Sequence, residues 1–169
     1  WYPEAWSEGS MELDIRLGGL NTAVLIASSL TMAFGVRCAQ MGQRKATVNW
    51  LLLTMVLGLT FLVVKFFEYK HKFELGHIPG PNFHFEGPHA DQVQIFLSLY
   101  FCLTGLHALH MVIGLGLMTV ITVMAWKGRF SPEWYTPVEM SGLYWHFVDI
   151  VWIFLFPLLY LVDRAHHFA

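Results

Sequence analysis

The chain has 169 residues, of which 56% are hydrophobic and 13% are charged, and its mean hydropathy is +0.50. This composition excludes an ordinary soluble domain and indicates an integral membrane protein. The net charge of -2 offers no basic field for nucleic acid, so nucleic-acid binding is excluded as well.

Four apolar runs predict an all-α, polytopic transmembrane helical bundle that forms a single domain, residues 1–169. Each run is long enough for a helix rising ~1.5 Å per residue to cross ~30 Å of hydrocarbon. The predicted spans cover about residues 18–39, 48–69, 93–125 and 141–162. Between them lie the polar segments 40–47, 70–92 and 126–140.

The second span carries two opposite charges near its end. Lys65 and Glu68 are three residues apart and so share one helical face. Charged groups one turn from the membrane interface can reach the headgroups or pair with each other. We therefore interpret these residues as a salt bridge at the end of the helix.

The segment 70–92 contains four histidines, a residue type that often binds metal ions. They are His71, His77, His84 and His89. Their spacing matches no known metal motif, and the prolines at 79, 81 and 88 indicate an extended surface loop. No metal site is expected here.

Two histidines lie near the centre of the third span. His107 and His110 are three residues apart on one face, with Thr104 below them and Gly114 above. Ionisable groups are costly in contact with lipid. This face is therefore expected to look into the protein.

The fourth span opens on Tyr144-Trp145-His146-Phe147-Val148-Asp149-Ile150-Val151-Trp152. Trp145, Asp149 and Trp152 follow an i, i+4, i+7 spacing, which predicts a polar and aromatic face opposite a lipid face. His146 and Asp149 are three residues apart, and the simplest interpretation is a hydrogen bond between them. Before this span, Pro132 and Pro137 are expected to end any helical continuation.

The distribution of basic residues favours one orientation in the membrane. The first and third loops hold five: Arg37, Arg44, Lys45, Lys127 and Arg129. The opposite side holds four: Arg16, Lys70, Lys72 and Arg164. Because loops retained inside carry the excess of Lys and Arg, both loops are expected inside and both termini outside.

Three function classes suit a small helical membrane protein. A di-haem membrane cytochrome would need histidine ligands at matching depth, but His107 and His110 lie deeper than His146. A transporter would use midplane polar groups and often repeated halves, and the two pairs of spans show no convincing repeat. A non-catalytic membrane subunit, whose polar stripes meet a partner or bound lipid, fits best.

Four motifs resemble subunit III of the haem-copper cytochrome oxidases, and they occur in the family's order. Residues 20–28 are similar to the start of the family's fourth helix, and Phe67-Glu68-Tyr69 is similar to the end of its fifth. Residues 104–110 resemble the Thr-Gly-x-His-x-x-His of the sixth helix. Residues 144–152 resemble the seventh almost letter for letter. The resemblance implies that the four spans are the last four of a seven-helix subunit.

The resemblance also implies a function and partners. The chain would be a non-catalytic subunit without haem, copper or other metal of its own, in an oxidase that reduces oxygen to water and pumps protons. Its partners would be the catalytic haem-copper subunit I, subunit II, bound phospholipid and, beyond them, a respiratory supercomplex, in the bacterial cytoplasmic membrane with the C-terminus outside. The expected lipid or partner contacts are Glu68, His107, His110, Arg129, Trp145, His146, Asp149 and Trp152.

The chain departs from the family at its front. The first three helices, including the third with its membrane-buried carboxylate, have no counterpart, and residues 1–17 resemble the linker after that helix. Some bacterial members lack the first two helices, so the resemblance implies either a bacterial short form of the subunit or part of a longer chain. The roles that this carboxylate has in the family are therefore not expected of this chain. Related third subunits serve quinol oxidases and some nitric oxide reductases, which leaves the electron donor open. Residues 128–139 resemble the bacterial cytochrome c oxidases and favour that group.

Overall fold

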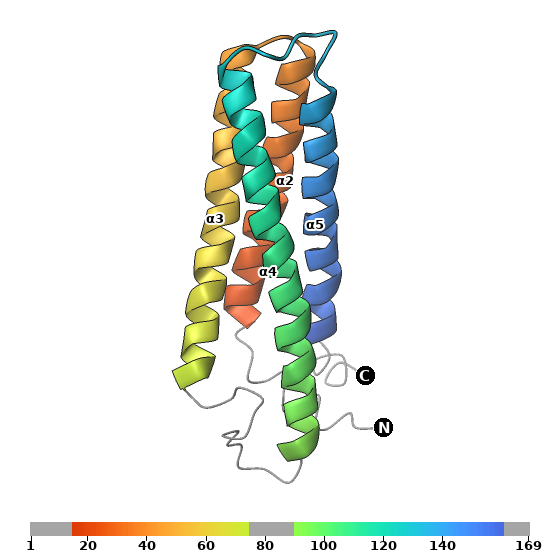
Figure 1. Cartoon of the computed structure of the whole chain (residues 1–169). Helices are drawn as coiled ribbons and strands as arrows, with labels where there is room; N and C mark the ends of the chain where they lie inside the picture. Colours follow the sequence, from red (N-terminus) through yellow and green to blue (C-terminus); the bar gives the residue numbers. More distant parts are fainter. Residues whose placement is uncertain (1–14, 75–89, 161–169) are drawn as a thin grey trace.

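The computed structural model describes residues 15–74 and 90–160 as four long helices in an antiparallel bundle (Figure 1). The helices are α2 (Ile15–Gln40), α3 (Arg44–Glu74), α4 (Ala90–Trp126) and α5 (Thr136–Tyr160). All four are long and apolar enough to cross a membrane. Among the described residues, the only extended pairing is an isolated bridge between Ser131 and Trp134. The predicted all-α transmembrane bundle is confirmed.

Helices extend into all three predicted connections, and α3 already begins at Arg44, within the segment 40–47. Helix α3 continues to Glu74 and α4 begins at Ala90, so both ends of the segment 70–92 are helical. Residues 75–89, with three of the four loop histidines, lie outside the described residues. Helix α5 begins at Thr136 and contains Pro137 in its first turn, where a missing N–H costs no hydrogen bond. The expectation that Pro137 ends helical structure was wrong.

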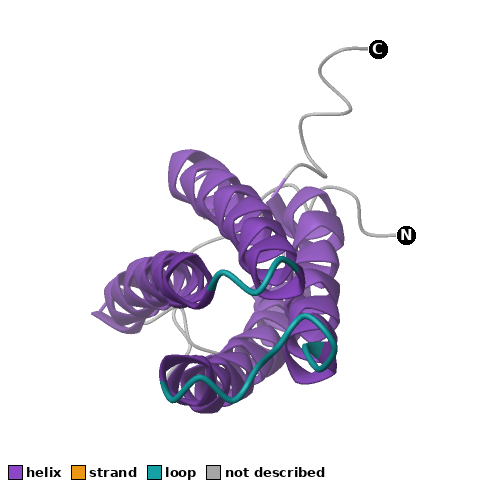
Figure 2. Cartoon of the chain, turned by 90° about the horizontal axis from the view of Figure 1, so that it is seen from above, coloured by secondary structure: helices purple, strands orange, loops and turns teal. Residues whose placement is uncertain are grey.

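The four helices form a closed ring in which each packs against two neighbours (Figure 2). Helix α2 contacts α3 and α5, and α4 contacts the same two helices, whereas the backbones across the ring do not meet. Side chains fill the centre of the ring. The bulkiest fully buried side chains include Leu25, Phe61, Tyr100, Trp145 and Trp152.

The outside of the bundle is covered by large apolar side chains. More than half of the surface of each of these residues is exposed: Leu30, Val56, Val112 and Phe154. Lipid tails are as apolar as these side chains, so the helices gain little from burying them against one another. Close packing and hydrogen bonds between helices must therefore hold the ring together.

Glycines end α2 and α4 in the same way. Gly42 and Gly128 have positive φ angles of 69° and 71°, which favour glycine because it has no Cβ. In each turn the glycine N–H and the next N–H reach back three and five residues, the Schellman arrangement. A Cβ on Gly42 would lie 2.9 Å from Pro132, and one on Gly128 would lie 3.1 Å from the Arg44 guanidinium. The two loops therefore pack against each other.

Candidate functional site

The side chain of Trp145 on α5 reaches all three other helices. Its indole is fully buried and donates from Nε1 to the Ser28 hydroxyl of α2 over 2.8 Å. A Cβ on Gly58 of α3 would lie 2.7 Å from ring atom Cη2, and one on Gly114 of α4 would lie 3.1 Å from Cζ3. The ring therefore packs against the bare backbones of two helices and bonds to a third. We call Trp145, Ser28, Gly58 and Gly114 the central joint.

Gly58→Ala is expected to destabilise the bundle by about 1–3 kcal/mol, the usual cost of overpacking a dense core. The reason is that the added methyl group would overlap the Trp145 ring. Thermal unfolding of the purified protein in detergent would measure the effect. Gly105→Ala is the matched control, since a Cβ there meets no atom within 4 Å. Equal melting temperatures for the two variants would contradict this account of the joint.

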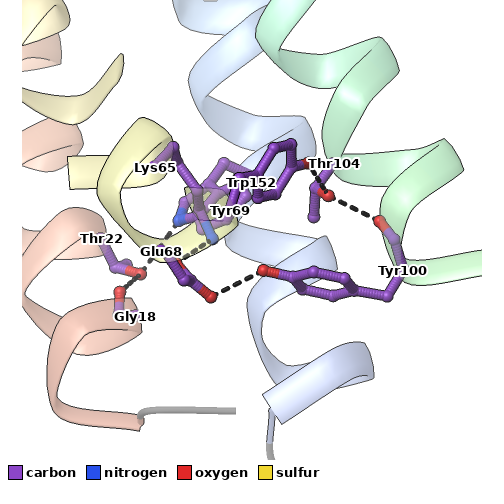
Figure 3. Close-up of polar contacts among 8 residues, drawn as sticks. All are labelled: Gly18, Thr22, Lys65, Glu68, Tyr69, Tyr100, Thr104 and Trp152. Atoms are coloured by element: carbon purple, nitrogen blue, oxygen red, sulfur yellow. Dashed lines mark hydrogen bonds and ion pairs between the residues drawn. The ribbon is translucent and has the colours of Figure 1, made fainter. Parts of the chain in front are cut away.

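A buried ion pair lies closer to the end of α3 (Figure 3). Lys65 Nζ and Glu68 Oε2 are 2.8 Å apart, and both residues are almost fully buried. The Tyr100 hydroxyl of α4 donates to the other carboxylate oxygen over 2.6 Å. Lys65 Nζ also lies 4.6 Å from a ring centroid of Trp152 on α5, a cation–π contact. We call these four residues the polar cluster.

The predicted pairing of Lys65 with Glu68 near the end of α3 is confirmed, but the pair is buried inside the bundle. Helix α3 continues past Glu68 to Glu74, and side chains from α4 and α5 enclose the pair. The two charged groups are therefore covered by protein side chains. They are balanced inside the bundle, where an unpaired charge would be costly.

Hydrogen bonds extend the polar cluster to α2 and along α4 (Figure 3). Trp152 Nε1 donates to the Thr22 hydroxyl over 3.1 Å, and that hydroxyl donates to the Gly18 carbonyl over 2.8 Å. On the other side, the Tyr69 hydroxyl bonds to the Thr104 hydroxyl, which donates to a backbone carbonyl of α4. All four helices thus meet at this cluster as well as at the central joint.

The two histidines of α4 differ in their surroundings. The buried His107 ring packs against Phe61 and Trp152, with centroid distances of 5.5 and 5.1 Å. Within the described part of the chain, its Nε2 atom has no hydrogen-bond partner. His110 is half-buried, and its Nδ1 bonds to the Leu106 carbonyl over 2.8 Å. Both rings line an otherwise apolar hollow of about 220 Å³ between α4 and α5.

The predicted hydrogen bond between His146 and Asp149 is not formed. His146 Nδ1 pairs instead with the Ser29 hydroxyl, 2.6 Å away, because α2 lies against this face of α5. Asp149 is 2% exposed, and neither carboxyl oxygen makes a hydrogen bond of ordinary geometry with another described residue. In residues 15–74 and 90–160, no group of three His, Cys, Asp or Glu side chains could hold a metal ion.

The eight predicted contact residues divide into two groups. Five are buried inside the bundle: Glu68, His107, Trp145, Asp149 and Trp152. Three reach the surface: His110, Arg129 and His146. Sequence reasoning missed Tyr100 and Ser28, which hold Glu68 and Trp145. Tyr100 could have been identified from the sequence, because its hydroxyl lies in an apolar run and a buried tyrosine hydroxyl needs a hydrogen-bond partner.

Comparison with known proteins shows that the chain is similar to members of one family. The family model for cytochrome c oxidase subunit III matches residues 5–163. Cytochrome c oxidase subunit 3 of Corynebacterium diphtheriae is 34% identical over 94% of this chain and 72% of its own length. The subunit 3 of Synechocystis is 35% identical over 94% of the chain and 62% of its length. That of Papio hamadryas is 33% identical over 83% of the chain, which spans about half (48%) of this relative.

Proposed function

The chain belongs to the cytochrome c oxidase subunit III family, and from this membership we propose that it is the non-catalytic third subunit of a proton-pumping haem-copper terminal oxidase in aerobic respiration. The family implies a complex with other oxidase subunits. In our proposal its partners are subunit I, which carries haem and copper, and subunit II. The chain stabilises subunit I, binds phospholipid and supports access of oxygen and protons, without catalytic residues or cofactor ligands of its own.

The family match carries this proposal, and a structural observation supports it, the use of polar side chains to join helices of the same chain. Glu68, Trp145 and Trp152 each bond to a residue on another helix. Such contacts make a firm scaffold whose outer surface is apolar, as a subunit that lies beside a catalytic partner in the membrane requires. The three predicted contacts that reach the surface are our candidates for partner or lipid contacts: His110, Arg129 and His146.

The proposed location is the bacterial cytoplasmic membrane, with the C-terminus outside. Support comes from the end of the bundle where the α2–α3 and α4–α5 loops pack together (Figure 1). This end carries five basic residues: Arg37, Arg44, Lys45, Lys127 and Arg129. Loops rich in Lys and Arg are retained on the cytoplasmic side.

Purification in mild detergent through a tag on this chain tests the proposed function. A reduced-minus-oxidised spectrum and identification of the co-purifying polypeptides would show the haem type and the partners. Haem a with a large copper-binding subunit is the expected result. Haem b or o on that subunit would favour the alternatives, a quinol oxidase or a nitric oxide reductase. Haem that stays on this chain after all partners are removed would contradict the proposal.

Lipid binding has a candidate site on α4 near the loops. A shallow groove of about 270 Å³ is apolar along Val120 and Val123 and ends at Lys127 and Arg129. Two cations above an apolar channel suit an anionic phospholipid, because a guanidinium can bond to a phosphate through two N–H groups while the acyl chain follows the channel.

Arg129→Ala is therefore expected to weaken retention of anionic phospholipid roughly fivefold, since one basic contact near the membrane surface contributes ~1 kcal/mol. Mass spectrometry of lipids that remain on the purified complex would measure this. Lys45→Ala is the control, because Lys45 is exposed at the same end of the bundle but does not line the groove. Identical lipid content in the two variants would rule out this site.

A further inference from the structure

Asp149 is a buried carboxyl group to which the fold offers no counter-charge. It is 2% exposed, and it forms no ion pair and no hydrogen bond of ordinary geometry with any other residue that the structure describes. The two helices that pack against α5 are α2 and α4. Helix α2 has no charged residue between Arg16 and Arg37. Helix α4 has no Lys, Arg, Asp or Glu in residues 92–126, so neither helix supplies a cation at this level.

The surroundings of Asp149 favour the neutral form of its carboxyl group. Trp145 and Trp152, both fully buried, lie one turn before it and one turn after it on the same face of α5. The Lys65 ammonium group on α3 is already paired with Glu68. A carboxylate enclosed in this way without a cation would be costly, and a buried acid keeps its proton instead. Asp149 therefore has the surroundings of a proton-binding group.

A single hydroxyl group lies between this carboxyl and a histidine that reaches the surface. Ser29 of α2 lies beside the Asp149 carboxyl, and its hydroxyl oxygen is 2.6 Å from Nδ1 of His146. His146 and Asp149 are one turn apart on α5, so the same hydroxyl can face both. His146 is half-buried, whereas Asp149 is enclosed. The three side chains thus form a row from the surface to the interior.

His146 lines a groove at the loop end of the bundle, between α2 and α5 (Figure 1). The groove has a volume of about 460 Å³, and Arg37, Gln40 and Glu139 contribute polar walls. A space of this size with several polar groups can hold water. In the proposed orientation the loop end faces the cytoplasm. The imidazole of His146 is therefore placed to exchange protons with water on that side.

We propose that Asp149 is a proton-binding site that exchanges its proton with the cytoplasmic side through Ser29 and His146. On release, the Asp149 O–H bond breaks and its proton goes to the Ser29 oxygen. The Ser29 proton goes to Nδ1 of His146, and the proton on Nε2 leaves to water in the groove. One proton is lost overall, Asp149 becomes a carboxylate, and the imidazole stays neutral with its proton on the other nitrogen. The reverse series reloads the carboxyl. The inference depends on the proposed function only for the side of the membrane.

Infrared difference spectra of the purified complex test this proposal, because a protonated carboxyl group has a C=O stretch that a carboxylate lacks. Wild type minus Asp149→Asn should contain such a band, and transfer to heavy water should shift it. Ser29→Ala and His146→Phe, each compared with its own Asp149→Asn form, should keep the band. They should slow its shift about tenfold, which corresponds to ~1.4 kcal/mol of barrier, because the proton loses a step of its path.

Thr60→Ala is the matched control, because it removes an exposed hydroxyl that bonds to a carbonyl of its own helix. This variant should exchange as fast as wild type. Wild type without the band would overturn the inference, and equal exchange rates in Ser29→Ala and Thr60→Ala would overturn the path. If Asp149→Asn does not assemble, isotope labelling of aspartate carboxyl carbons assigns the band without a substitution.

The haem content and the co-purifying polypeptides of the same preparations separate this inference from the proposed function. An intact oxidase with haem a that lacks the band contradicts only the proton-binding site. A preparation that shows the band but contains no oxidase partner contradicts only the proposed function, because the site consists entirely of residues of this chain.

Discussion

Trp145→Ala is expected to be among the most damaging single substitutions in this chain, with a loss of about 3–5 kcal/mol. Trp145 is fully buried, and its ring lies against the Gly58 and Gly114 backbones. Alanine would leave a cavity at the centre of the ring of helices and would remove the donor that bonds to Ser28. Thermal unfolding in detergent would measure the loss of stability, and co-purification would measure the loss of oxidase partners.

Two further variants separate the causes of this effect. Trp145→Phe keeps most of the ring volume but loses the Nε1 donor, and should cost only about 1 kcal/mol. Phe147→Ala is the control on the same helix, because Phe147 is 58% exposed toward lipid. Melting temperatures lowered equally by Trp145→Ala and Phe147→Ala would show that the centre of the bundle is not where its stability resides.

Glu68→Gln is expected to destabilise the bundle by about 3–5 kcal/mol, because it leaves the buried Lys65 ammonium group without its counter-charge. Glutamine keeps the shape of the side chain and an oxygen that can accept from Tyr100. The expected loss is thus due to charge and not to packing. Yield and thermal midpoint of the purified variant would measure it.

Removing both charges tests this explanation. Lys65→Met together with Glu68→Gln should recover much of the stability, since a buried pair can be replaced by neutral groups at little cost. The coupling energy follows from the two single variants and the double variant. Lys45→Met controls for the loss of a lysine at an exposed position. A double variant as unstable as the sum of the two single variants would exclude a charge effect.

Part of the arrangement within the helices could be predicted from spacing. The i, i+4, i+7 series Trp145, Asp149 and Trp152 lies on the buried face of α5, as periodicity predicts. Lys65 and Glu68 pair for the same reason. Hydropathy predicted the four crossings because no other structure satisfies the backbone in lipid over so many residues.

Contacts between helices could not be predicted in this way. His146 bonds to Ser29 rather than to Asp149, because the antiparallel packing of α2 brings a hydroxyl to that side of α5. Gly58 carries no periodic signal, and its role depends only on where the Trp145 ring lies. The burial of Lys65 likewise depends on Trp152, which is far away in the chain. Such pairs depend on the register between helices, which a single sequence does not contain.

The ring of helices has a consequence for how the protein is made. Helix α5 leaves the ribosome after the other three, yet it carries the Trp145 and Trp152 side chains that fill the centre. At synthesis rates of ~5–20 residues per second, the first three helices wait roughly 2–7 s for it. During that time the Ser28 hydroxyl and the Lys65–Glu68 pair lack their α5 partners. Nascent chains should therefore depend on an insertase or chaperone that shields this open side until α5 has been inserted.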